Sequence, residues 1–175
     1  GDVAQPISLI LLVPDRATLS SLMTAAGWHE ADPPSPGNLA HAAITVWFGG
    51  SYNTAPITPA FWQARPHDMG FQRASSADTL RERHHARFWD SGTTSQDGLA
   101  IFVGTTSFDD GLKWGLTHHI DPNIDAERDF LVQGLVATGA FSAPETLPLV
   151  PPVLGQNLVG DAFFTDGNAI LLRAK

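Results

Sequence analysis

Apolar residues near the start of the chain follow first a strand pattern and then a helix pattern. The run from Ile7 to Val13 is continuously apolar and stops at Pro14, which predicts a buried strand. Asp15 can cap the helix that follows. In that segment, apolar residues recur at helical spacing until Gly27 ends the pattern: Leu19, Leu22, Met23 and Ala26.

The middle of the chain alternates between apolar runs and irregular stretches. The run from Leu39 to Val46 is predicted to be helical, and the stretch from Tyr52 to Arg65 is predicted to be largely irregular. Phe71 to Ala74 reads as a short strand. Arg81 to Trp89 and Leu99 to Val103 read as two further strands, and together they predict an antiparallel hairpin.

Turn and cap residues organise the next part of the chain. A loop is expected at residues 109–111, where two aspartates precede a glycine. Asp121 and Pro122 predict a helix start, with Asp121 as the N-cap and Pro122 at the first helical position. Gly139 suits the C-terminal cap of that helix. Its apolar stripe is formed by Ile124, Leu131 and Leu135.

The last part of the chain is rich in proline and then in strand-forming residues. Residues 144–152 are expected to form a proline-rich loop, and residues 159–165 and 169–172 to pair as a hairpin across Asp166-Gly167. Strands and helices are mixed without a regular βαβ rhythm. We therefore predict an α+β fold, a single domain over residues 1–175 with a mainly antiparallel sheet and helices packed on it.

Composition narrows the classes of function. The chain has 43% hydrophobic and 16% charged residues, which is typical of a globular domain, and a formal charge of -8, which disfavours nucleic-acid binding. It contains no cysteine, so disulfides and thiolate chemistry are excluded. No apolar stretch reaches the roughly 18–20 residues of a membrane-spanning helix.

The strand predicted at Arg81 to Trp89 carries unusual chemistry. Because strand side chains alternate between faces, Arg83, His85 and Arg87 share one face, while Ala86 and Phe88 point the other way, towards the core. Arginine forks suit phosphate or carboxylate, and an imidazole adds a group that transfers protons near neutral pH. The alternative interpretation is a solvated face neutralised by neighbouring acids.

A second polar cluster precedes and opens the predicted helix. It contains His118, His119 and Asp121, followed by Asp125, Glu127 and Arg128. Histidine and carboxylate could ligate a metal, although adjacent histidines seldom both reach one ion, and free amides at a helix start could hold an anion. The structural alternative is that these acids complement the helix dipole and that Asp125 pairs with Arg128.

Taken together, the two clusters resemble the LssY C-terminal domain family over roughly Pro6 to Leu135. The residues that carry the resemblance are Arg83-x-His85-x-Arg87-x-Trp89, then Val103-Gly104, then His118-His119-Ile120-Asp121 and Asp125-x-Glu127-Arg128-Asp129. The resemblance implies a bacterial domain of poorly defined function, found fused to DedA-like and phosphatidic-acid-phosphatase-like membrane domains. It thereby implies a membrane-associated context, with a membrane-embedded domain or partner upstream.

Three hypotheses about function stay open at this point. The first is an accessory domain with a phosphate or other anion site, in which Arg83 and Arg87 clamp the ligand, His85 or His118 is the catalytic group if a reaction occurs, and the helix-start residues complete the site. The second is a phosphoester or metal-dependent hydrolase. The third is a non-catalytic interaction domain whose polar residues form a structural salt-bridge network. No cofactor and no nucleic-acid partner is predicted.

Overall fold

The computed structural model describes residues 5–32, 54, 57, 59–75, 82–113, 117–157 and 160–175. Its helices in this part of the chain are α1 (Arg16–Ala25) and α3 (Ile124–Ala137). Its strands are β1 (Leu9–Val13), β2 (His29–Glu30), β3 (Phe61–Trp62), β4 (Arg65–Pro66), β5 (Met69–Ala74), β6 (Glu82–Thr94), β7 (Ala100–Lys113), β8 (Thr117–Ile120), β9 (Glu145–Pro148), β10 (Val153–Gln156), β11 (Ala162–Thr165) and β12 (Asn168–Arg173). The helix predicted from Leu39 to Val46 lies outside the described residues.

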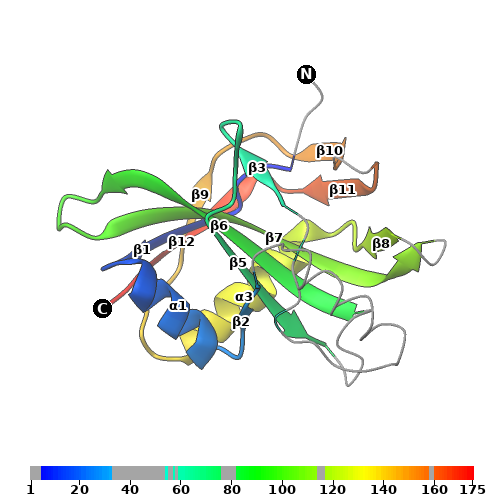
Figure 1. Ribbon diagram of the computed structural model, residues 1–175. Coiled ribbons are helices and arrows are strands. Elements are labelled where there is room, and N and C mark those ends of the chain that lie inside the picture. Colours follow the sequence, from blue (N-terminus) through cyan, green and yellow to red (C-terminus); the bar gives the residue numbers. More distant parts are fainter. Residues whose placement is uncertain are drawn as a thin grey trace.

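One large sheet organises the molecule (Figure 1). Its strand order is β2-β5-β6-β7-β1-β12-β9, and β8 pairs with β7 beside this path. Within this sheet, the described strand pairings are antiparallel except that of β1 with β12. The described part of the chain is therefore an α+β domain with mainly antiparallel strands, as predicted.

The N-terminal predictions are confirmed. β1 lies within the predicted apolar run, and α1 begins after Asp15, whose carboxylate accepts a hydrogen bond from the Thr18 amide at 2.7 Å. Gly27 follows the helix at a φ of 84°, a conformation that glycine adopts without strain.

The β6–β7 hairpin is confirmed but is longer than predicted. The loop predicted at residues 109–111 is wrong, because β7 continues through these residues to Lys113. The strand persists because β6 pairs with it on one side and β8 on the other. A register shift between Asp109 and Gly111 absorbs the irregular sequence.

The prediction for the start of α3 needs correction. The helix N-cap is Asn123, whose side chain accepts from the Ala126 amide, and not Asp121. Asp121 instead accepts from the Asn123 amide at 2.7 Å and shapes the turn before the helix. Gly139 follows the helix at a φ of 77°, as its predicted role at the C-terminal end requires.

The last two predicted strands exist, but they do not pair with each other. β11 pairs with β10, whereas β12 joins the large sheet between β1 and β9. The turn at Gly167 is held by the amides of Leu149 and Val150, which donate to its carbonyl oxygen, so the chain leaves one sheet and enters the other. Part of the predicted proline-rich loop is β9, an edge strand, where proline is tolerated.

The large sheet has one strongly apolar face. Side chains from α1 and α3 share a buried cluster with alternate residues of the central strands, among them Leu11, Ala86, Phe88 and Phe102. The prediction that Ala86 and Phe88 point towards the core is confirmed. None of the described helices is long and apolar enough to cross a membrane.

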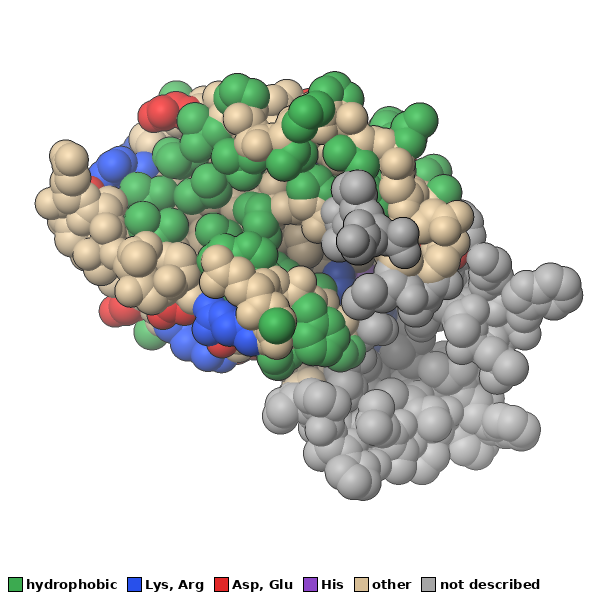
Figure 2. Space-filling model, turned by 90° about the horizontal axis from the view of Figure 1, so that it is seen from above, with side chains coloured by type: hydrophobic (Ala, Val, Ile, Leu, Met, Phe, Trp, Pro, Cys, Tyr) green, Lys and Arg blue, Asp and Glu red, His purple; other side chains and the backbone are tan. Residues whose placement is uncertain are grey.

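Exposed apolar side chains gather elsewhere on the surface. Figure 2 shows hydrophobic side chains spread over the face seen from above. Leu154 and Phe164, which are cross-strand neighbours in the β10–β11 hairpin, are both exposed, as are Leu149 and Val150. Exposed apolar side chains are common on folded proteins, so this surface alone assigns no function.

Gly104 provides a test of the packing between β7 and β6. A Cβ at this position would lie 2.5 Å from the Phe88 ring and 3.0 Å from the Arg87 carbonyl oxygen. We expect Gly104→Ala to lower the free energy of unfolding by about 1–3 kcal/mol, because the buried ring must move. Gly134→Ala in α3, whose nearest neighbour would be Ala26 at 3.9 Å, should stabilise by up to about 1 kcal/mol. Urea denaturation of both variants measures these changes. Equal changes in the free energy of unfolding of the two variants would contradict the packing described.

Candidate functional site

Three neighbouring strands place polar side chains together on the face of the sheet opposite the apolar core. Pairing sets His85 between Gln72 and Ser107, and sets Arg83 beside Asp109. Arg87 pairs with Thr105 in the next row. We call this surface the arginine face and define it by Gln72, Arg83, His85, Arg87, Thr105, Ser107 and Asp109.

The arginine face is largely buried and internally hydrogen-bonded. Arg83 and His85 are each 5% exposed. Arg83 donates to the Gln72 side chain, His85 Nε2 lies 3.0 Å from an Asp109 carboxylate oxygen, and Arg87 donates to the Ser107 hydroxyl at 3.1 Å. Arg87 is half-buried, so it is the most accessible of the three predicted residues.

Burial shapes the electrostatics of this face. Burial lowers the pKa of His85, and Asp109 partly offsets that effect. Burial also lowers the pKa of Arg87, again against the influence of Asp109. The second nitrogen of His85, Nδ1, is buried and has no hydrogen-bond partner within the part of the chain described. Its hydrogen-bonding capacity is therefore not used by the residues that the structure describes.

His67 belongs to the same region and is missed by sequence reasoning. Its Nδ1 accepts from the Ala60 amide at 3.3 Å, and its Nε2 lies 3.0 Å from the position of a Cβ on Gly70, the residue that pairs with Arg87. Burial and then the positive charge of Arg87 lower the pKa of His67 to about 4. The only sequence signal was a histidine close to a strand, which does not indicate a charged neighbour.

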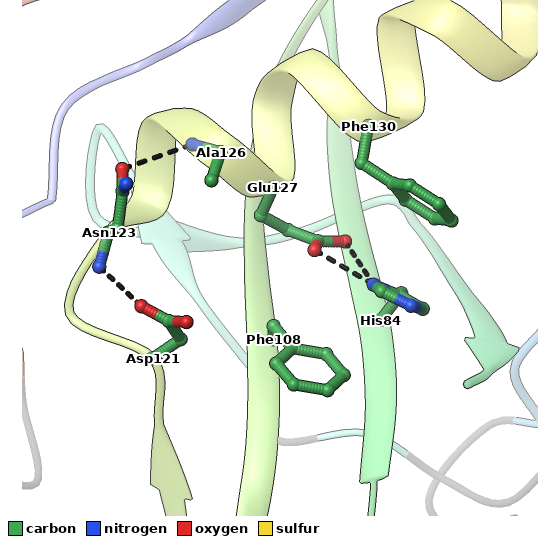
Figure 3. A pocket seen from close by; sticks show the side chains of 7 residues that line it. All are labelled: His84, Phe108, Asp121, Asn123, Ala126, Glu127 and Phe130. Atoms are coloured by element: carbon green, nitrogen blue, oxygen red, sulfur yellow. Dashed lines mark hydrogen bonds and ion pairs between the residues drawn. The ribbon is translucent and has the colours of Figure 1, made fainter. Parts of the chain in front are cut away.

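A pocket of about 200 Å³ lies on the opposite side of β6, at the start of α3 (Figure 3). His84 Nδ1 lies 2.8 and 3.0 Å from the two carboxylate oxygens of Glu127. The imidazole stacks on Phe130 with ring centroids 4.2 Å apart and lies 4.7 Å from the Phe108 ring. We call this space the α3 pocket; it is also lined by Asp121, Asn123 and Ala126.

The pair of His84 with Glu127 joins two elements of the fold. Glu127 is 5% exposed, and burial raises the pKa of its carboxyl group, with His84 opposing the rise and Asp121 adding to it. Strand alternation placed His84 opposite His85, but no sequence signal identified its partner 43 residues away. Glu127 was predicted as a site residue, and the structure places it and Asp121 at this pocket.

Asp125 and Arg128 lie in a third set of contacts, between α3 and the turn that precedes β12. Arg128 donates to the Asp125 and Asp166 carboxylates at 3.2 and 2.9 Å and to the Asn168 carbonyl oxygen at 3.0 Å. Asp125 also accepts from Thr165 and from the Asp166 amide. Arg128 is 5% exposed, so these contacts form a structural clamp.

The histidines before the helix start lie in β8. The backbone of His118 pairs with Leu112 of β7, and that of His119 pairs with Gly111; their side chains are outside the described part. His85 pairs with Ser107, five positions before Leu112, so His118 is displaced by roughly 15 Å along the strand direction. Within the described residues, no three His, Asp or Glu side chains are grouped to hold a metal ion.

Comparison with models of protein families assigns the chain to a family. The family model described as LssY C-terminus matches residues 1–169. The chain belongs to the LssY C-terminus family. A comparison with curated proteins gave no match, and neither did a comparison with solved structures.

In this LssY C-terminus domain, the two sequence clusters are divided between faces of the sheet. Arg83, His85 and Arg87 lie on the arginine face, whereas Asp121 and Glu127 line the α3 pocket on the other side of β6. The structure does not bring these two groups into one site. The reason is that α3 contacts β6 through His84, which points away from its neighbour His85.

The pKa of His67 predicts a pH dependence of stability. Between its ordinary value of 6.5 and about 4, the unfolded chain binds a proton that the folded chain does not, so stability should fall as the pH drops through this window. Because the ring is partly exposed, we expect a loss of roughly 1–2 kcal/mol. His67→Asn, which keeps an acceptor near the Ala60 amide, should have a flatter profile in urea denaturation between pH 7 and 4. Identical profiles for the two proteins would contradict the burial of His67 beside Arg87.

Proposed function

We propose that this domain binds a small oxyanion, a phosphate or carboxylate group, on the arginine face. The observation that carries the proposal is that a buried arginine, histidine and aspartate lie on one face of the central strands beside a half-buried second arginine. Arg87 is the principal ligand in this proposal because it is half-buried and reachable. On the same face of β6, His85 lies between Arg83 and Arg87, about 7 Å along the strand from each.

The energetics of burial support a functional role for this face. Removing charged groups from water is expensive, and apolar residues of similar size often stabilise a fold as well or better. The opposite face of the same strands shows that this sheet can be covered by apolar packing. Groups with perturbed pKa values that gather in one cluster, as His67, His85 and Arg87 do, are typical of functional sites.

The available groups suit an oxyanion. An arginine fork donates two hydrogen bonds to a phosphate or carboxylate, and the Ser107 and Thr105 hydroxyls lie in the adjacent strand. With Nε2 directed at Asp109, His85 Nδ1 accepts a hydrogen bond from a protonated phosphate oxygen, or donates one when the ring is charged. An oxyanion near Arg87 would also offset the effect of burial on that guanidinium.

Phosphate titration tests the proposal. We expect inorganic phosphate, added at constant ionic strength, to raise the pKa of His67 followed by NMR, because the anion weakens the field of Arg87. Arg87→Gln should raise the same pKa without ligand and should weaken phosphate binding by at least about tenfold in calorimetry.

Arg73→Gln is the matched control. Arg73 lies in the neighbouring strand β5 but contacts the Phe130 ring and the Ala26 carbonyl oxygen on the helix side. This variant should keep the phosphate affinity of the parent. If inorganic phosphate caused no saturable response in the folded parent protein, the oxyanion site would be excluded. That result would favour a non-catalytic interaction domain with a structural polar network.

A phosphoester hydrolase is the second candidate, and the pairing of His85 with Asp109 beside the arginines favours it. Asp109 would hold the imidazole through Nε2, so that Nδ1 takes a proton from the attacking water and gives it to the leaving oxygen as the P–O bond breaks. Hydrolysis of p-nitrophenyl phosphate that His85→Gln abolishes, with phosphate binding retained, supports this candidate. The membrane-associated context and an upstream membrane-embedded partner stay proposals that depend on the resemblance described above.

A further inference from the structure

The α3 pocket is separate from the arginine face and has its own chemistry. Its volume of about 200 Å³ is below the roughly 300 Å³ at which pockets for drug-sized ligands begin. Ala126 on its rim is exposed, and Asp121 and Phe130 are partly exposed, so a solute can reach it. The pocket therefore suits a ligand of only a few non-hydrogen atoms.

His84 is held rigidly in this pocket. Phe130 and Phe108 flank the imidazole, and Trp28 meets it edge-on at 6.2 Å between ring centroids. Because an ionised carboxylate only accepts hydrogen bonds, Nδ1 carries the proton that is shared with Glu127. The contact fixes the buried Glu127 carboxylate beside the pocket.

The charges of the lining select against anions. No lysine or arginine lines the α3 pocket, whereas the carboxylates of Asp121 and Glu127 both do. One oxygen of Asp121 accepts from the Asn123 amide. Figure 3 shows Asp121 on one side of the space and the pair of His84 and Glu127 on the other, with the Phe108 ring between them. Acceptor atoms and negative charge thus face a space bordered by aromatic rings.

We propose that the α3 pocket is a second binding site of this domain and that it takes a small primary-amine cation. The ammonium group donates a hydrogen bond to the Asp121 carboxylate, and the negative charge of Glu127 borders the same space. The short apolar part of the ligand lies against Phe108 and Phe130. Three N–H donors on one nitrogen match a site that offers acceptors, and the ligand's positive charge matches the two carboxylates.

Ethylammonium is a suitable probe because it is small and carries one charge. We expect ethylammonium chloride to cause saturable shifts of the His84 side-chain and Ala126 amide signals in ¹⁵N NMR spectra of the domain. Sodium chloride at the same ionic strength and ethanol, the uncharged analogue, should not saturate the site. Saturable shifts of the same signals caused by sodium chloride or by ethanol at a similar concentration would overturn the proposal.

Two variants of equal charge locate the site. Asp121→Asn should weaken ethylammonium binding by at least about tenfold, because the amide still accepts from Asn123 but has no charge. Asp129→Asn removes the same charge from an exposed position of α3 outside the pocket lining and should leave the affinity within about twofold. Equal weakening in both variants would show non-specific attraction and would overturn the site.

A third variant tests the cavity itself. Ala126→Leu adds bulk at the rim while keeping a strong helix former, and it should abolish saturable binding. Binding that persists in this variant, with a cooperative unfolding transition, would overturn the pocket as the site; if the variant unfolds, the Asp121 comparison decides. Arg87→Gln should leave ethylammonium binding unchanged, so the two proposed sites can fail separately.

Discussion

The two-residue alternation of side chains along β6 is the constraint on which both candidate sites depend. His84 and His85 are sequence neighbours, but the pleat of the strand directs them to opposite faces of the sheet. His84 enters the layer of α1 and α3 and meets Glu127, whereas His85 joins Asp109 on the arginine face. A one-residue change of register would exchange these environments and place Arg83 and Arg87 against the apolar core.

This arrangement separates two kinds of charge by the thickness of one sheet. Arg83 and Arg87 dominate one face, and carboxylates of the α3 start dominate the pocket on the other. Each face presents a histidine whose orientation is fixed by a carboxylate. In the two sites proposed above, the same pair of side chains, imidazole and carboxylate, is thus assigned opposite ligand preferences because the neighbouring charges differ.

Local patterns predicted the elements that depend on local physics. The apolar run of β1, the cap at Asp15 and the alternation of β6 follow from nearby residues, and they were found as expected. The predicted strand pairing near the C-terminus was wrong. Asp166-Gly167 is a strong hairpin signal, but hydrogen bonds from the Leu149 and Val150 amides to Gly167 direct the chain into another sheet. Asp121 failed as an N-cap because Asn123, two residues later, serves the helix amide instead.

The composition of each candidate site depended on tertiary contacts and was less accessible to sequence reasoning. The arginine row was found from its spacing, but His67 joins it only through the pairing of Gly70 with Arg87. Glu127 was singled out beside the arginines, yet its contact is His84, because helix α3 lies over the other face. Spacing can assign a side chain to a face of its own strand, but it cannot show which distant element covers that face.

The most direct measurement is a histidine-selective ¹⁵N NMR titration of one sample with phosphate and a second with ethylammonium. The account predicts that phosphate shifts the ring nitrogens of His85 and His67 and leaves His84 unchanged, while ethylammonium shifts His84 and leaves His85 and His67 unchanged. If either ligand shifted His84 and His85 together with one affinity, the two faces of β6 would not be independent sites, and the account would be contradicted.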